Sequence, residues 1–167
     1  MESVYRPCHH AYMVLWHYEL KTPMGQMRAA FDGRGRLQEL VLENTYDPRQ
    51  TSPLPPREQR EAKRYLDRQL DAYLAGTLRT FTVPLDPQGP FTSQRIWEAV
   101  RAIPYGRSTD PETLATDLGL DPDVVVMACA SNPIVLLIPV HRVILPGEGP
   151  LPRALRELES GHGWRKP

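Results

Sequence analysis

The sequence predicts an α/β N-terminal domain, with a short antiparallel sheet plus a helix, followed by a mostly α-helical domain with a helix-turn-helix. Two observations support this fold class. Apolar runs rich in branched and aromatic residues dominate the start of the chain, whereas stretches with helical periodicity and helix-capping residues dominate its second half. The length of 167 residues suits two small domains. We place their boundary in the proline- and glycine-containing linker at 86–90, which gives domains 1–88 and 89–167.

Three strands are predicted in the N-terminal domain, at residues 12–20, 24–31 and 37–43, because each run is rich in the residue types that β-sheets favour. The second and third runs are joined by residues 32–36, and a glycine-bearing link between two apolar runs indicates a hairpin. The proline-rich stretch 47–56 is predicted to be a loop.

A long helix is predicted from Arg57 to Ala75, because its apolar residues fall on one face and its charged residues on the other. Gly76 is well placed to end this helix. Phe81 and Val83 suggest a short strand after it. The apolar face of the helix consists of Ala62, Leu66, Leu70, Tyr73 and Leu74.

Three helices are predicted in the C-terminal domain. The first covers residues 92–102, with Thr92 or Ser93 as its N-cap. The other two, at about 110–119 and 121–130, each open with an Asp-Pro pair that suits a helix start. Together they form a helix-turn-helix pattern, which is more often simple helix packing than a DNA-reading motif.

The charge of the chain is balanced, with 20 basic and 20 acidic residues. Before Gly89 there are 12 basic and 11 acidic residues, and after it 8 basic and 9 acidic ones. Neither domain has the basic excess typical of nucleic-acid-binding domains. No apolar run approaches the ~20 residues of a membrane span, and the N-terminus lacks a signal-peptide pattern. We therefore expect a cytoplasmic protein without a membrane association.

The two cysteines, Cys8 and Cys129, are too few and too far apart for a disulfide framework, so both are predicted to be free thiols. Cys8 is followed by His9 and His10, and cysteine with histidine is a zinc-binding combination. Adjacent residues rarely complete a tetrahedral site, and the sequence has no second cluster of this kind. We therefore predict neither a metal nor a cofactor.

The most specific motif surrounds position 140. Asn132-Pro133 precedes an apolar run at 134–138, and Pro139-Val140-His141-Arg142-Val143 follows it. This segment resembles the active site of the alkylguanine-DNA alkyltransferase (methylated-DNA–protein-cysteine methyltransferase) family, whose pattern ends in Pro-Cys-His-Arg-Val. Segments 74–85 and 91–106 resemble the same family, in the same order and spacing. The resemblance implies a ribonuclease-H-like N-terminal domain and an alkyltransferase-type C-terminal domain.

In that family, the protein flips an alkylated guanine out of duplex DNA and a cysteine thiolate accepts the alkyl group. The resemblance assigns His141 to the histidine that deprotonates the cysteine through a water, and Glu159 to the glutamate that orients the histidine. Asn132 matches the asparagine that shapes the preceding turn. Val140 stands at the position of the cysteine, and valine has no nucleophile. We therefore expect no alkyl transfer, no enzymatic activity and a structural role for His141.

Three further departures from the family concern DNA. Ala130 falls where the family has an arginine that fills the space left by the flipped base, and Pro111 falls where it has a base-rotating tyrosine. The loop that walls the alkyl pocket is missing, because residues 145–150 lead almost directly into the last helix. Arg107 and Arg142 are candidate phosphate contacts, with solvated or paired surface arginines as the alternative.

Two classes of function are compatible with this pattern. Alkyltransferase-like proteins, a subset of the family, lack the cysteine yet bind alkylated guanine. The first class of function is therefore that of a DNA-repair-related protein, and we expect its binding to double-stranded DNA to be weakened. Asp121 and Asp123 open the predicted recognition helix and would be repelled by phosphates. The alternative is a protein-interaction or structural module, bound to a protein partner, that has lost DNA binding. A monomer is expected in both cases.

Overall fold

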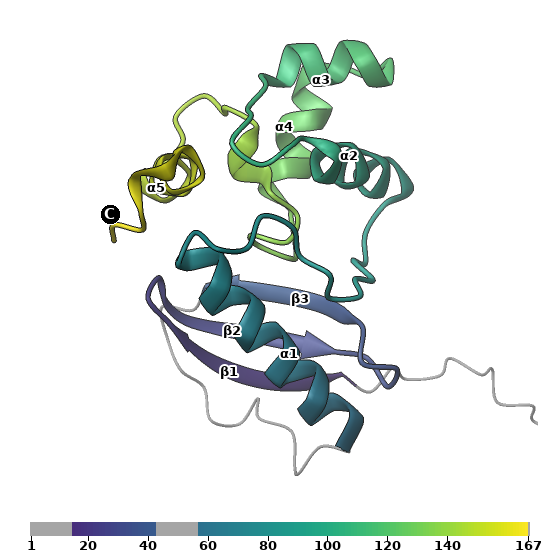
Figure 1. Ribbon diagram of the computed structural model, residues 1–167. Helices are drawn as coiled ribbons and strands as arrows, with labels where there is room; N and C mark the ends of the chain where they lie inside the picture. The colour runs from purple at the N-terminus through teal and green to yellow at the C-terminus, as the bar shows by residue number, and fades with distance from the viewer. Residues whose placement is uncertain (1–14, 43–56, 167) are drawn as a thin grey trace, which may run out of the picture.

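The computed structural model describes residues 15–42 and 57–166 (Figure 1). It confirms the predicted fold class, because a three-stranded antiparallel sheet and a long helix precede a mostly helical C-terminal part. Within the described ranges, no helix is both long enough and apolar enough to cross a membrane. The elements are β1 (Trp16–Thr22), β2 (Gly25–Phe31), β3 (Leu37–Leu42), α1 (Arg57–Leu74), α2 (Phe91–Ala102), α3 (Pro111–Leu118), α4 (Pro122–Ala130), the 3-10 turn η2 (Val140–Arg142), α5 (Pro150–Glu157) and the π-helical turn η3 (Leu158–His162).

The sheet has the strand order β1-β2-β3, and both neighbouring pairs are antiparallel. The predicted hairpin joins β2 to β3, and Asp32 shapes it: its Oδ1 accepts the backbone N–H groups of Arg34 and Arg36, each at 2.9 Å. Hydrogen bonds of this kind are the reason why aspartate favours turns.

Helix α1 lies across one face of the sheet (Figure 1). Its apolar stripe faces the core, as the periodicity predicts, and Leu66, Leu70 and Tyr73 are each at most 1% exposed. The N–H of Gly76, at φ +74°, donates to the carbonyl of Tyr73 just beyond the helix end.

Helices α3 and α4 begin where the Asp-Pro pairs predict. Asp110 caps α3 by accepting the N–H of Thr113 at 2.7 Å, and Gly119 ends this helix in the left-handed conformation at φ +66°. Asp121 caps α4 in the same way, through the N–H of Asp123 at 2.8 Å. The two helices pack against each other.

Two local predictions are wrong. Neither Thr92 nor Ser93 caps α2, which begins at Phe91 after Pro90 and has no side-chain cap. The strand at residues 81–83 does not form, because the N–H of Thr82 donates to the side chain of Gln69.

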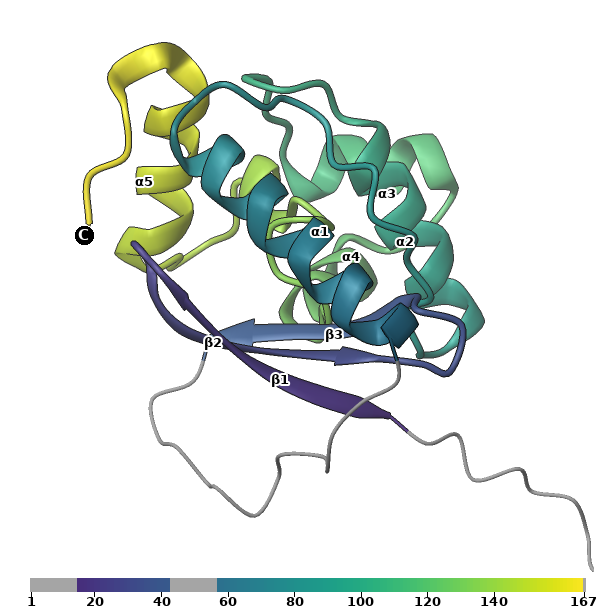
Figure 2. The same cartoon turned by 60° about the horizontal axis from the view of Figure 1, so that its bottom comes forward.

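The C-terminal helices lie beyond the β3 edge of the sheet (Figure 1). Two isolated bridges pair this edge strand with later, non-helical segments of the chain. Leu37 pairs with Leu85, and Leu40 pairs with Ile134. Figures 1 and 2 both place the C-terminal end of α1 next to α5. One buried cluster includes residues from the sheet, from α1 and from the C-terminal helices. The domain boundary between residues 88 and 89 stays a prediction.

Candidate functional site around His141 and Glu159

The loop at residues 133–138 leads into the site, and the side chain of Asn132 forms hydrogen bonds near both of its ends. Its side-chain amide donates to the carbonyl of Ile138 at 3.1 Å, and its oxygen accepts the N–H of Ile134 at 3.0 Å. Within this loop Leu136 adopts φ +72°, a conformation that is uncommon for residues other than glycine. Asn132 thus fixes the run that leads into η2, which contains Val140 and His141.

Glu159 is the hub of a buried polar network. Its Oε1 lies 2.9 Å from Nε2 of His141, although the two residues belong to different turns, η3 and η2. His141 is 3% exposed and Glu159 is 6% exposed. The structure therefore brings together the histidine and the glutamate that the resemblance paired.

Arg142 completes the charge balance of this network. Its Nη2 lies 2.8 Å from Glu159 Oε1, and its Nε lies 3.0 Å from Oε2. A further hydrogen bond joins Nη1 to the carbonyl of Ile103 at 2.6 Å. Arg142 is only 7% exposed, so its predicted place on the surface is wrong. The guanidinium is retained inside because a buried carboxylate needs a partner of opposite charge.

The ionisation states follow from these contacts. Burial alone would raise the pKa of Glu159, but hydrogen bonds from His141, Arg142, Tyr73 and the N–H of Gly106 outweigh it and hold that pKa well below its usual value. Burial lowers the pKa of His141, and the positive charges of Arg142 and Arg156 act in the same direction against the raising effect of Glu159. At neutral pH the network therefore contains a carboxylate, a guanidinium and a neutral imidazole.

Sequence reasoning missed two members of the network. The hydroxyl of Tyr73, from α1, donates to Glu159 Oε1 at 2.7 Å, and the backbone N–H of Gly106 donates to Oε2 at 2.9 Å. Tyr73 looked like one more apolar residue of the helix stripe, and only its hydroxyl distinguishes it from the leucines beside it. Gly106 could have been suspected from its glycine identity, since it adopts φ +74° and an added Cβ would lie 3.2 Å from the carbonyl oxygen of Glu159.

The remaining predicted residues lie outside this network. Val140 is half-buried, Pro111 is buried at the start of α3, and Ala130 and Arg107 are exposed. Their predicted relations to DNA stay predictions. The Cys8-His9-His10 segment lies outside the described residues.

The second cysteine, Cys129, lies in α4 and forms no disulfide. It is 3% exposed, and burial raises the pKa of its thiol to about 11. A thiol with this pKa is almost entirely protonated at neutral pH.

Comparison with known proteins shows the family of the chain. Residues 91–153 match the family model for the 6-O-methylguanine DNA methyltransferase, DNA-binding domain. A methylated-DNA–protein-cysteine methyltransferase of Mycobacterium tuberculosis is 36% identical over 155 residues, covering 86% of this chain and 92% of the relative. The chain belongs to this methyltransferase family.

Solved structures of family members have the same fold. The crystal structure of the M. tuberculosis O6-methylguanine methyltransferase is 33% identical and has a TM-score of 0.76, covering 89% of this chain and 94% of that one. The M. tuberculosis OGT crystallised in complex with DNA is 31% identical, with the same TM-score of 0.76 and the same coverage.

Membership of the methyltransferase family corrects one expectation. From Val140 we expected no alkyl transfer and no enzymatic activity, but relatives that span nearly the whole chain are named methyltransferases. The described part of the chain also contains a thiol, at Cys129. These names overturn the expectation of an inactive chain, which rested on the residue at a single position of the motif.

Proposed function

We propose that this chain is a DNA-repair-related protein that binds double-stranded DNA containing O6-alkylated guanine. The observation that carries the proposal is the complete buried network of His141, Arg142 and Glu159, directly after position 140 and largely within the segment that matches the family's DNA-binding domain. Buried charges are costly unless they are paired, and here the Glu159 carboxylate has both the Arg142 guanidinium and the His141 imidazole as partners. The DNA complex of the M. tuberculosis relative supports the same partner.

We propose that Val140 occupies the position at which the family motif has its alkyl-accepting cysteine. Any alkyl group that this chain takes onto a thiol must then end on Cys8 or Cys129, because the sequence contains two cysteines. Peptide mass spectrometry after incubation with a duplex carrying O6-methylguanine tests this assignment. A methyl group found on either cysteine identifies the acceptor, and a methyl group at another residue would show that this chain transfers alkyl groups without a thiol.

We propose that the affinity for DNA is weaker than a basic recognition helix would give. The N-terminal turn of α4 carries the exposed Asp121 and Asp123, which repel phosphates instead of replacing counterions. Ala130 offers no guanidinium at the position where the family has an arginine, and Pro111 offers no hydroxyl at the position of the tyrosine. Arg107, exposed between α2 and α3, is the phosphate contact that we propose.

Fluorescence anisotropy with short duplexes, with and without one O6-methylguanine, tests the DNA-binding proposal. We expect tighter binding of the damaged duplex and a loss of affinity at higher salt. Arg107→Gln should weaken binding to both duplexes and reduce the salt slope by roughly 1, whereas Arg95→Gln, on the exposed face of α2, should change neither. Equal affinity for both duplexes would overturn the proposal that the protein recognises the damaged base.

A second candidate is a protein-interaction module that has lost DNA binding. The apolar surface of α4 favours it, since Met127 is 71% exposed and Val124 is 37% exposed. The absence of binding to either duplex at low salt would select this candidate. A monomeric state and a cytoplasmic location are part of both proposals, and analytical ultracentrifugation tests the first of these.

A further inference from the structure

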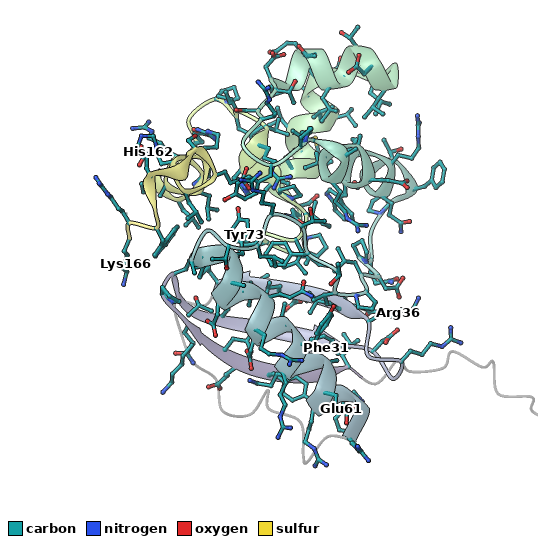
Figure 3. The ribbon with its side chains drawn as sticks, viewed as in Figure 1. Phe31, Arg36, Glu61, Tyr73, His162 and Lys166 are labelled. Carbon is teal, nitrogen blue, oxygen red and sulfur yellow. The ribbon has the colours of Figure 1, made fainter. Side chains whose placement is uncertain are left out.

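Tyr73 connects α1 to the polar network of the C-terminal part. Its hydroxyl lies 2.7 Å from Glu159 Oε1 and 3.3 Å from His141 Nε2, and the side chain is fully buried. Figure 3 shows Tyr73 at the end of α1 that is nearest to α5. The Tyr73–Glu159 contact spans 86 positions of the sequence, so only the folded chain can form it.

The aromatic ring of Tyr73 is held in place from two sides. The ring of Phe81 lies 5.0 Å away, and that of Tyr105 lies 6.1 Å away in an edge-to-face arrangement. These ring contacts and the burial of the side chain define the position of the phenol. The hydroxyl therefore reaches Glu159 from a position that is set by the packing of α1.

The direction of this hydroxyl proton bears on the state of His141. The hydroxyl donates to the closer Glu159 oxygen, and burial together with the charge of Glu159 raises the pKa of Tyr73, so that proton stays on the phenol. His141 Nε2 then faces two acceptors, the carboxylate and the phenol oxygen. Nε2 must carry the imidazole proton, which leaves Nδ1 as the unprotonated nitrogen.

We propose that Tyr73 is a positioning residue of the site: its hydroxyl fixes the Glu159 carboxylate and, through it, the tautomer and orientation of His141. The inference rests on the proposed function, because a fixed His141 matters to DNA repair only if the site beside position 140 is used. The charged and titratable groups that act on His141 are Glu159 from η3, Arg142 from η2, Arg156 from α5 and Tyr73 itself. Of these, Tyr73 is the neutral one that can be changed without removing a charge.

Nitrogen-15 NMR of the imidazole groups tests the proposal, with the His141 signal assigned by its loss in His141→Gln. In the wild-type protein we expect the Nε2–H tautomer. In Tyr73→Phe one donor to Glu159 is lost, so the carboxylate attracts the imidazole proton more strongly and the pKa of His141 rises by roughly half a pH unit or more. Tyr65→Phe is the matched control, because it removes a hydroxyl from the same helix that contacts Thr82 instead of the network.

Several results would contradict the proposal. A wild-type Nδ1–H tautomer would overturn it without any variant, and this measurement remains decisive if Tyr73→Phe does not fold. An unchanged His141 pKa in a folded Tyr73→Phe protein would reduce Tyr73 to a packing residue. An equal rise in Tyr65→Phe would have the same meaning. A lack of DNA binding would overturn the proposed function but would leave the NMR result for Tyr73 as it stands.

Discussion

Arg156 in α5 donates a hydrogen bond to the backbone carbonyl of His141, with Nη1 and the oxygen 2.7 Å apart. The same guanidinium pairs with Glu148, to which Nη1 donates at 2.9 Å. One side chain therefore joins the last helix to η2 and to the short loop at 144–149. Hydrogen bonds from Arg156, which outweigh burial, lower the pKa of Glu148, so the pair is ionised at neutral pH.

Arg156→Gln is expected to destabilise the protein by about 1–3 kcal/mol, because the carbonyl of His141 and the carboxylate of Glu148 both lose a charged donor in a partly buried place. Urea unfolding at neutral pH measures the change. Arg153→Gln, an exposed arginine on the same helix, is the control and should stay within about 0.5 kcal/mol of the wild type. Equal losses in both variants would show that the hydrogen bonds of Arg156 are not important for stability.

Gly89→Ala should cost about 1–3 kcal/mol through overpacking. A Cβ at this position would lie 2.6 Å from Cη2 and 2.9 Å from Cζ3 of Trp97. The indole cannot easily move away, since it is 2% exposed and its Nε1 donates to the carbonyl of Ala128 at 2.7 Å. Thermal unfolding measures the effect. Gly33→Ala is the comparison, because its added methyl would meet no atom within 4 Å.

How much could be predicted depends on the range of the interactions that determine each feature. Helices α3 and α4 were predictable because an aspartate, a proline and a turn determine their ends within a few residues. The strand expected at Val83 does not form, because the N–H of the adjacent residue Thr82 donates to the side chain of Gln69 in the preceding helix. No local sequence pattern reveals this contact.

The same difference applies to the site. His141 and Glu159 could be paired in advance because the resemblance to the alkyltransferase family assigns both of them. Tyr73 could not, since its contact with Glu159 depends on how α1 packs against the C-terminal part. Arg142 was expected as a phosphate contact or as a solvated or paired arginine at the surface, and only the folded chain shows the carboxylate that keeps it inside.

Stability is expected to fall as the pH decreases below about 6.5, the usual pKa of histidine. Burial lowers the pKa of His141 in the folded state, so below that pH the unfolded chain binds more protons and the free energy of unfolding falls. The pKa of Glu159 is also lowered in the folded state, so the free energy of unfolding falls further below pH 4.5, the usual pKa of this group. Urea unfolding between about pH 7.5 and 5 measures the slope. His162→Gln, an exposed position, should keep the slope, and a flat wild-type curve would contradict the prediction.

Cys129 should react slowly with iodoacetamide in the folded protein. A pKa of about 11, compared with the usual 9.0, leaves roughly one hundredth of the ordinary thiolate at neutral pH, and burial limits access further. The Cys8→Ser variant isolates this thiol, and intact mass spectrometry follows its labelling with time. Urea should make labelling fast. Rapid labelling without urea would show that α4 opens readily.

Asp123→Lys should strengthen binding to duplex DNA if α4 approaches the phosphates, as the proposed function requires. The change removes a repelled carboxylate and adds a cation that can displace a counterion, so the slope of log affinity against log salt should steepen by roughly 0.9. Asp123 is the suitable aspartate, because the side chain of Asp121 caps the helix. Asp71→Lys makes the same charge change on α1 and serves as the control. Equal effects of both variants would indicate a general charge effect instead of contact at α4.

The bridge between Leu40 and Ile134 on the outer side of β3 has a consequence for how the chain can be divided. Leu40 donates its N–H to Pro133 and accepts the N–H of Val135, both at 2.8 Å, so a segment from the far end of the chain covers this strand. A fragment that stops at residue 88 would leave those backbone groups unpaired along an apolar strand edge. Such an edge recruits other strands, and self-association through it is a common route to aggregation. The C-terminal part thus shields this strand edge of the sheet, in addition to carrying most of the site.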